Sequence, residues 1–101
     1  MSAPPFEIAF TSEALRVLED LGKPKHADKL ARIQEALSLL RDFGPSYPSL
    51  RTHQMQSIKG VNGKPVFQSY VENNTPSAWR IWWQYSDQPE QISIVSIGPH
   101  P

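Results

Sequence analysis

The sequence contains no cysteine, and this absence excludes disulfide bonds and thiolate metal sites. It also fits a reducing compartment. Only three histidines are present, and no two of them have the spacing that is typical of metal ligands. We therefore expect neither a metal ion nor any other cofactor.

Long hydrophobic runs are absent as well. No stretch approaches the roughly 18 consecutive apolar residues that a membrane-spanning helix needs, and residues 1–5 lack the regions of a signal peptide. These absences predict an intracellular protein of the cytoplasm with no membrane partner. The chain has 101 residues, 39% hydrophobic and 20% charged, as expected for a single globular domain over residues 1–101.

The formal net charge is zero, because ten Lys and Arg residues balance ten Asp and Glu residues. The charges are nevertheless unevenly distributed. Residues 23–64 hold eight of the ten basic side chains and only three of the ten acidic ones. This basic segment is suited to attract phosphates or an acidic partner. For its helical part, residues 23–41, a solvated helix face is the favoured explanation.

The first half of the chain predicts one strand and two helices. Apolar residues alternate over residues 6–10, which indicates a half-buried strand. Thr11 can cap a first helix over residues 12–21. Apolar residues recur every three or four positions over residues 25–43, which predicts a second helix that ends at Gly44. The short connection makes the two helices an antiparallel hairpin.

The second half predicts loops followed by strands. Residues 45–65 are rich in Pro and Gly, which favours loop structure with a short strand near residues 55–58. Strand-like runs at 66–72, 78–85 and 91–101 are joined by short polar turns and predict an antiparallel meander. The predicted fold class is therefore α+β: an N-terminal strand, an antiparallel helix hairpin, and an antiparallel three-stranded meander, in one sheet with both helices on one face.

Alternation along the strands separates two faces of the predicted sheet. The predicted core under the helices consists of Phe10, Leu18, Ile33, Leu37, Leu40, Phe67, Ile81 and Trp83. The opposite, open face then carries Tyr70, Glu72, Arg80 and Trp82. An arginine in an aromatic strand is costly unless it is solvated, paired or facing an anion. This face is suited to grip a phosphate beside a base, or to hold an Arg80–Glu72 cross-strand ion pair that only stabilises the sheet.

Four runs of the sequence, taken together and in order, resemble the RelE/ParE toxin superfamily, on its HigB-like side. They are Leu50–His53, Val66–Asn73, Ala78–Trp83 and Ile97–Pro101. The order of one strand, two helices and a meander also matches that superfamily. The resemblance implies a RelE-like fold and a small bacterial toxin of a type II toxin–antitoxin system, which is neutralised by a cognate antitoxin protein.

The resemblance implies two kinds of activity. Many RelE-like toxins are metal-independent endoribonucleases that cleave messenger RNA on the ribosome and so inhibit translation, whereas ParE-like toxins inhibit DNA gyrase and are not nucleases. In a nuclease, Arg80 would be the catalytic, phosphate-binding arginine, and His100 would be the C-terminal histidine that acts as acid or base. The neutral net charge fits a gyrase inhibitor or an inactive RelE-like binding module better.

The residue types support the chemistry of RNA cleavage. The planar fork of an arginine donates two parallel hydrogen bonds to phosphate, and a histidine titrates near working pH. Glu72 is a further candidate for the catalytic base, provided that it lies near Arg80. His100 is equally explained as a frayed terminal residue. The candidate RNA-binding residues are Tyr70 and Trp82, which can stack on a base, and Arg51, His53, Lys59 and Lys64.

Overall fold

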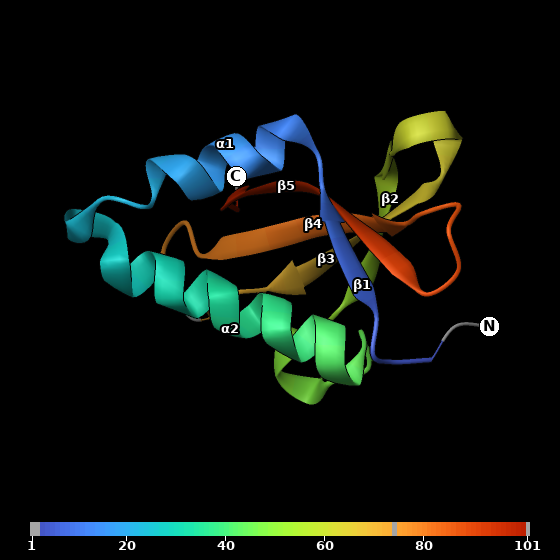
Figure 1. The fold of residues 1–101 in the computed structure, drawn as a ribbon, viewed down its shortest axis with the longest axis horizontal. Coiled ribbons are helices and arrows are strands. Elements are labelled where there is room, and N and C mark those ends of the chain that lie inside the picture. The colour runs from blue at the N-terminus through green and yellow to red at the C-terminus, as the bar shows by residue number, and fades with distance from the viewer. Residues whose placement is uncertain (1–2, 74, 101) are drawn as a thin grey trace.

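The computed structural model describes residues 3–73 and 75–100, so Asn74 of one predicted turn and Pro101 of the predicted ending lie outside the described residues. Its elements in chain order are β1 (Glu7–Phe10), α1 (Ser12–Asp20), the 3₁₀ turn η1 (Pro24–His26), α2 (Ala27–Phe43), the 3₁₀ turn η2 (Pro48–Leu50), β2 (His53–Lys59), the 3₁₀ turn η3 (Val61–Gly63), β3 (Pro65–Tyr70), β4 (Trp79–Tyr85) and β5 (Gln91–Pro99) (Figure 1).

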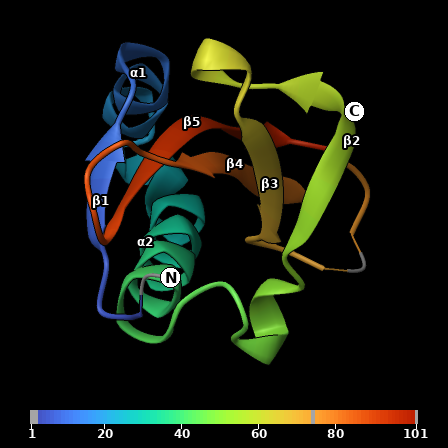
Figure 2. The same cartoon turned by 90° about the vertical axis from the view of Figure 1, so that its right-hand side faces the viewer.

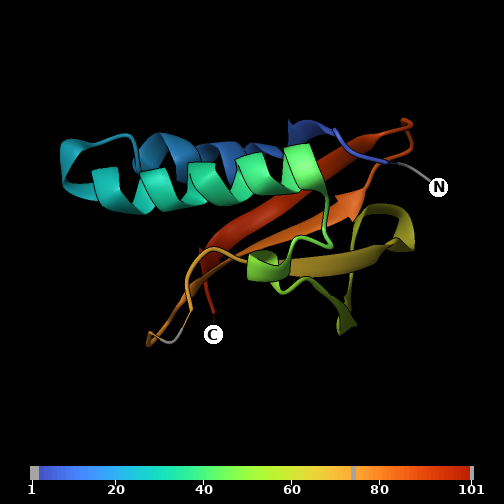
Figure 3. The same cartoon turned by 90° about the horizontal axis from the view of Figure 1, so that it is seen from below.

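The strands form one five-stranded sheet in the order β1-β5-β4-β3-β2. β1 runs parallel to β5, and the other neighbouring pairs are antiparallel. Both helices lie on the same side of the sheet, which is clearest when the molecule is seen from below (Figure 3). The predicted α+β class, with a helix hairpin covering one sheet face and a C-terminal meander, is therefore confirmed.

The largest difference from the sequence expectation is β2. The sequence predicted only a short strand near residues 55–58, but β2 spans His53–Lys59 and pairs with β3 as an edge strand. The Pro and Gly residues that suggested loop structure stand beside this strand, and the register shift between Met55 and Lys59 absorbs the irregularity. β2 and β3 lie at the sheet edge away from β1, as the turned view shows (Figure 2).

The first helix is tied to the sheet at its N-terminus. Thr11 Oγ1 accepts a hydrogen bond from the Ala14 backbone N–H at 3.2 Å, which confirms the predicted cap. The same hydroxyl donates to the Val95 carbonyl of β5 at 2.7 Å. α2 ends at Gly44, whose φ of 85° lies in the region that favours glycine. No helix of residues 3–73 and 75–100 is long and apolar enough to cross a membrane.

The core lies between the two helices and the sheet. Four of the predicted core residues are buried, namely Ile33, Leu40, Ile81 and Trp83. The other four are partly buried and pack against this cluster, namely Phe10, Leu18, Leu37 and Phe67. The sequence therefore assigned the helix-facing side of β4 correctly. The residues between them on the strands must lie on the opposite face, where the candidate site is found.

Candidate functional site on the open sheet face

Two adjacent rows of cross-strand partners run across the open sheet face, which is the face away from α1 and α2. The first row lies across β3, β4 and β5 and consists of Tyr70, Arg80 and Gly98. The second row lies across β2, β3, β4 and β5 and consists of His53, Gln68, Trp82 and Ser96. Because residues two apart on a strand share a face, the two rows form one continuous surface.

Arg80 is held in place by backbone carbonyls and by an aromatic ring. Its Nη1 donates to the carbonyl oxygen of Glu72 at 2.7 Å and to that of Trp79 at 3.1 Å. Its guanidinium carbon lies 3.6 Å from the centroid of the Tyr70 ring, which is a cation–π contact. The predicted position beside Tyr70 is confirmed. The residue as a whole is only 8% exposed in this arrangement, and partial exposure of its guanidinium stays a prediction.

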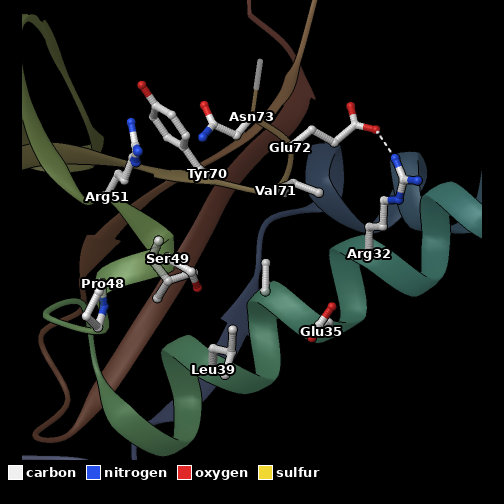
Figure 4. A pocket seen from close by; sticks show the side chains of 12 residues that line it. Arg32, Glu35, Leu39, Pro48, Ser49, Arg51, Tyr70, Val71, Glu72 and Asn73 are labelled. Atoms are coloured by element: carbon white, nitrogen blue, oxygen red, sulfur yellow. Dashed lines mark hydrogen bonds and ion pairs between the residues drawn. The ribbon is translucent and has the colours of Figure 1, made fainter. Parts of the chain in front are cut away.

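Glu72 does not lie on the open face, which corrects the sequence prediction. Its carboxylate binds Lys29 Nζ at 2.6 Å and Arg32 Nη1 at 3.0 Å, and both cations belong to α2 on the helix side. Figure 4 shows Glu72 reaching toward Arg32. The same carboxylate accepts the Trp79 backbone N–H at 3.1 Å. The cross-strand ion pair between Arg80 and the Glu72 carboxylate is therefore replaced by a bond from Arg80 to the Glu72 carbonyl.

These contacts make Glu72 a poor proton acceptor. Burial raises the pKa of its carboxyl group, but the hydrogen bonds from Lys29, the Trp79 backbone and Arg32 lower it by more, and the pKa lies below its usual value. A base for RNA cleavage must hold a proton near neutral pH, and a carboxylate with a lowered pKa does not. Glu72 is accordingly a structural residue that fastens the end of β3 to α2.

Replacing Glu72 by glutamine is expected to lower the free energy of unfolding by about 1–3 kcal/mol near neutral pH, since its carboxylate accepts charged hydrogen bonds. The folded-state pKa is lower than that of the unfolded chain. This contribution is therefore present above the unfolded pKa and disappears as the pH falls through the folded pKa. Urea unfolding at about pH 7 and about pH 3 measures it. A deficit of equal size at both values would show that the charge of Glu72 contributes nothing.

Arg51 lies next to Tyr70 (Figure 4). Its guanidinium carbon is 5.9 Å from the Tyr70 ring centroid, and its backbone has a left-handed φ of 45°. Arg51 and Tyr70 also border a cavity of about 550 Å³ between α2, η2 and the end of β3 (Figure 4). Tyr70 thus contacts both Arg80 and Arg51, which places three of the candidate residues together.

His53 and Gln68 are neighbours on the open face. His53 Nδ1 lies 3.2 Å from the Arg51 carbonyl oxygen, and His53 Nε2 lies 3.4 Å from Gln68 Nε2. A carbonyl oxygen only accepts, so Nδ1 carries the proton, and Nε2 accepts from the Gln68 amide. Gln68 is 3% exposed, and its Oε1 is buried without a hydrogen-bond partner. The sequence interpretation did not select Gln68, although the alternation placed it beside Tyr70.

A groove of about 330 Å³ on the open face adjoins the second row. Its lining residues come from β2, β3, β4, β5 and the turn after β2, and they are Ile58, Lys59, Gly60, Val66, Trp82, Val95, Ser96 and Pro99. Trp82 Nε1 is buried without a hydrogen-bond partner. The groove thus brings together two candidate residues, Trp82 and Lys59, and it has the apolar walls that suit a flat ring.

The structure places His100 next to β4 and Lys64 at the far end of that strand. The His100 backbone N–H donates to the Ala78 carbonyl at 2.8 Å, beside the pair formed by Arg80 and Gly98. The end of β5 therefore lies beside the strand that carries Arg80, as predicted. Lys64 instead forms an ion pair with Asp87 and donates to the Tyr85 carbonyl at 3.3 Å. Tyr85 lies five positions from Arg80, about 16 Å along the strand.

Three buried polar side-chain atoms of the described residues have no hydrogen-bond partner, and all three lie on the open face. They are Gln68 Oε1, Arg80 Nε and Trp82 Nε1. Buried polar groups are almost always paired, because an unpaired one costs about 1–3 kcal/mol. The cluster is thus well suited to a ligand that accepts two hydrogen bonds and donates one. Within residues 3–73 and 75–100, no three His, Asp or Glu side chains gather closely enough to hold a metal ion.

Comparison with known proteins gives matches among solved structures, whereas no family model and no curated protein matches the sequence. The YoeB dimer from Staphylococcus aureus has 13% identity and a TM-score of 0.68 over 96% of this chain and 99% of that one. The archaeal RelE–RelB complex from Pyrococcus horikoshii OT3 has 12% identity and a TM-score of 0.64 over 94% of each chain. The YoeB/ParE toxin from Agrobacterium tumefaciens has 10% identity and a TM-score of 0.63 over 95% of this chain and 100% of that one.

At such identities the similarity is one of fold, and it extends over nearly the whole chain. The predicted HigB-like side of the superfamily is not singled out by these structures and stays a prediction. The topology is nevertheless the one expected from the sequence, with a helix hairpin and a C-terminal meander on one sheet. The chain therefore has the RelE-like fold that is shared by the toxins of the RelE/ParE superfamily.

Proposed function

We propose that this chain is the toxin of a toxin–antitoxin pair and that it cleaves messenger RNA on its open sheet face. The observation that carries the proposal is the cluster of unpaired atoms there, above all the buried Nε of Arg80. A structural arginine is expected to be fully paired, whereas a phosphate-binding arginine must keep donors for its ligand. The antitoxin partner is inferred by analogy with the RelE–RelB complex.

The contacts of Arg80 indicate which edge of its guanidinium group can bind the phosphate. Nη1 is already occupied by two carbonyl oxygens. The edge formed by Nε and Nη2 keeps donors for the two parallel hydrogen bonds that a phosphate accepts. In cleavage by the 2′-hydroxyl, negative charge develops on the phosphate as that oxygen attacks and the 5′-oxygen leaves. Donors fixed in advance at this position stabilise that charge without reorganisation.

Two proton transfers complete the reaction, since the 2′-hydroxyl loses a proton and the leaving 5′-oxygen gains one. With Glu72 turned toward α2, and with both ring nitrogens of His53 engaged by Arg51 and Gln68, His100 is the candidate for one transfer and water for the other. His100 follows the strand segment that pairs with Arg80. An imidazole can take or give a proton, so this residue type suits either transfer. The products are a 2′,3′-cyclic phosphate and a free 5′-hydroxyl.

The groove beside Trp82 is the proposed position of a base. Trp82 in its lining stands two residues after Arg80 on β4 and on the same face of the sheet. A base in the groove and a phosphate at Arg80 can therefore belong to one nucleotide. Lys59 adds a positive charge to the lining of this groove. Tyr70 already stacks on Arg80, so its proposed task is to position the arginine rather than to stack on RNA.

Inhibition of DNA gyrase is the second candidate function, and the neutral net charge favours it, since RNA binding gains from excess positive charge. Inducing the protein in bacteria while following protein synthesis and DNA supercoiling separates the candidates. The expected result is an arrest of translation with cleaved, ribosome-bound messenger RNA. A DNA-damage response with altered supercoiling would support the gyrase inhibitor instead, and undisturbed growth would contradict any toxin.

A further inference from the structure

We propose that Gln68 makes the open sheet face selective for RNA over DNA, by accepting a hydrogen bond from a ribose 2′-hydroxyl. This inference rests on the proposed function, because it concerns the same face and a nucleic-acid ligand. Gln68 would thus determine specificity, although it takes no part in the proposed binding of the phosphate or of the base.

The orientation of the Gln68 amide follows from His53. The Arg51 carbonyl oxygen lies 3.2 Å from His53 Nδ1 and fixes the proton there. His53 Nε2 is then an acceptor, and it receives the Gln68 amide N–H at 3.4 Å. The amide nitrogen of Gln68 is thereby turned toward β2, and Oε1 is turned away from His53. Gln68 Oε1 remains buried and unpaired, because the neighbouring His53 Nε2 accepts a hydrogen bond and has none to donate.

Gln68 lies diagonally across from Arg80 on the sheet. Gln68 pairs with Trp82, and Arg80 stands two residues before Trp82 on the same strand and the same face. Such diagonal neighbours have Cβ atoms within about 7–8 Å, which long side chains can bridge. In RNA the 2′-oxygen is separated from the adjacent phosphorus by only three intervening atoms. A phosphate bound by Arg80 Nε therefore brings a 2′-hydroxyl within reach of Gln68 Oε1.

The chemistry of an amide oxygen selects the ribose. Oε1 can only accept, so it needs a donor from the ligand. Phosphate, sugar ring and ester oxygens are all acceptors, and the 2′-hydroxyl is the single donor within the sugar–phosphate backbone of an RNA strand. DNA lacks it and would leave Oε1 buried and unpaired in the complex. Because a buried acceptor without a partner is costly, a site that pairs with a hydroxyl discriminates strongly against a ligand that lacks one.

The test compares the affinities of the intact chain for three single-stranded oligonucleotides of one sequence, measured by fluorescence polarisation. They are RNA, DNA and 2′-fluoro RNA, whose sugar resembles ribose but has no hydroxyl to donate. We expect RNA to bind about tenfold more tightly than either of the others. Equal affinity for RNA and 2′-fluoro RNA would overturn the inference, since it would show that shape is recognised. Failure to bind any of the three would contradict the proposed function itself.

Replacing Gln68 by methionine tests the residue directly, because methionine keeps the length of the side chain and removes the amide oxygen. The expected result is a loss of about tenfold in RNA affinity and an unchanged DNA affinity, so that the two become similar. Trp82→Phe is the matched control, since it removes the Nε1 donor from the same row and should weaken RNA and DNA alike. A preference for RNA that survives in Gln68→Met would overturn the assignment. Should Gln68→Met not fold, the 2′-fluoro comparison on the unchanged protein still decides.

Discussion

Replacing Trp83 by alanine is expected to lower the free energy of unfolding by about 3–5 kcal/mol, the largest stability effect that we expect in this chain. Trp83 is fully buried, and its ring stacks on Phe67 with a centroid distance of 4.8 Å. Its Nε1 also donates to Ser69 Oγ at 2.9 Å, and Ser69 is itself fully buried. Alanine therefore leaves a cavity and removes the donor of a buried hydrogen bond.

Equilibrium unfolding in urea measures this effect through the midpoint and the slope of the transition. Trp83→Phe is the informative companion, because it keeps most of the ring and removes only the Nε1 donor, at an expected cost of about 1–3 kcal/mol. Tyr85→Ala on the same strand is the exposed control, since Tyr85 is 40% exposed and should lose less than Trp83 does. Similar losses at Trp83 and Tyr85 would mean that Trp83 does not fill the core.

The burial of Trp83 could be predicted because β4 pairs with β3 without interruption from Arg80 to Trp83. Along this stretch alternation assigns each side chain to a face, and the register shift between Trp82 and Trp83 concerns only the pairing with β5. The two helices were equally accessible to prediction, since their apolar residues recur with the helical period and Thr11 supplies a cap. Residue periodicity along the sequence was therefore sufficient to predict an element where that periodicity is uninterrupted.

Glu72 shows where the same reasoning fails. β3 ends at Tyr70, and the backbone N–H groups of Val71 and Glu72 both donate to the Trp79 carbonyl, at 3.1 Å and 3.2 Å. Two residues then oppose one, as in a bulge, and the alternation does not continue beyond Tyr70. Glu72 consequently turns to the helix side and meets Lys29 and Arg32. A sequence pattern with period two carries no signal for this change.

Gln68 was missed for a different reason. Its position on the open face follows from alternation, but its partners depend on the register of β2 and β4, which a single sequence does not specify. β2 was itself underestimated, because Pro and Gly residues beside it favoured a loop. The row that joins His53, Gln68 and Trp82 becomes visible only once both neighbouring strands are in place. Candidate residues on β4 were therefore easier to find than their neighbours on β2 and β3.

Replacing Arg80 by alanine or by lysine is expected to reduce cleavage of ribosome-bound messenger RNA by at least about 100-fold, the typical effect of losing one charge-stabilising donor. Lysine keeps the positive charge, but it lacks the Nε–Nη2 edge and cannot donate two parallel hydrogen bonds to one phosphate. It should therefore rescue little of the activity. Arg41→Ala is the matched control, because Arg41 pairs with Asp42 on the exposed surface of α2 and should leave cleavage unchanged.

A structural task of Arg80 must be separated from a catalytic one, because its Nη1 also binds the carbonyl oxygens of Glu72 and Trp79. Losing those bonds is expected to cost about 1–3 kcal/mol in the free energy of unfolding. Cleavage is therefore compared at temperatures where circular dichroism shows each variant folded. Added guanidinium ion supplies the missing donors to Arg80→Ala and should restore part of the cleavage, whereas it restores nothing in a protein that is merely unfolded. If folded Arg80→Ala cleaves at the unchanged rate, Arg80 only braces the connection between β3 and β4, and the open face is not a nuclease site.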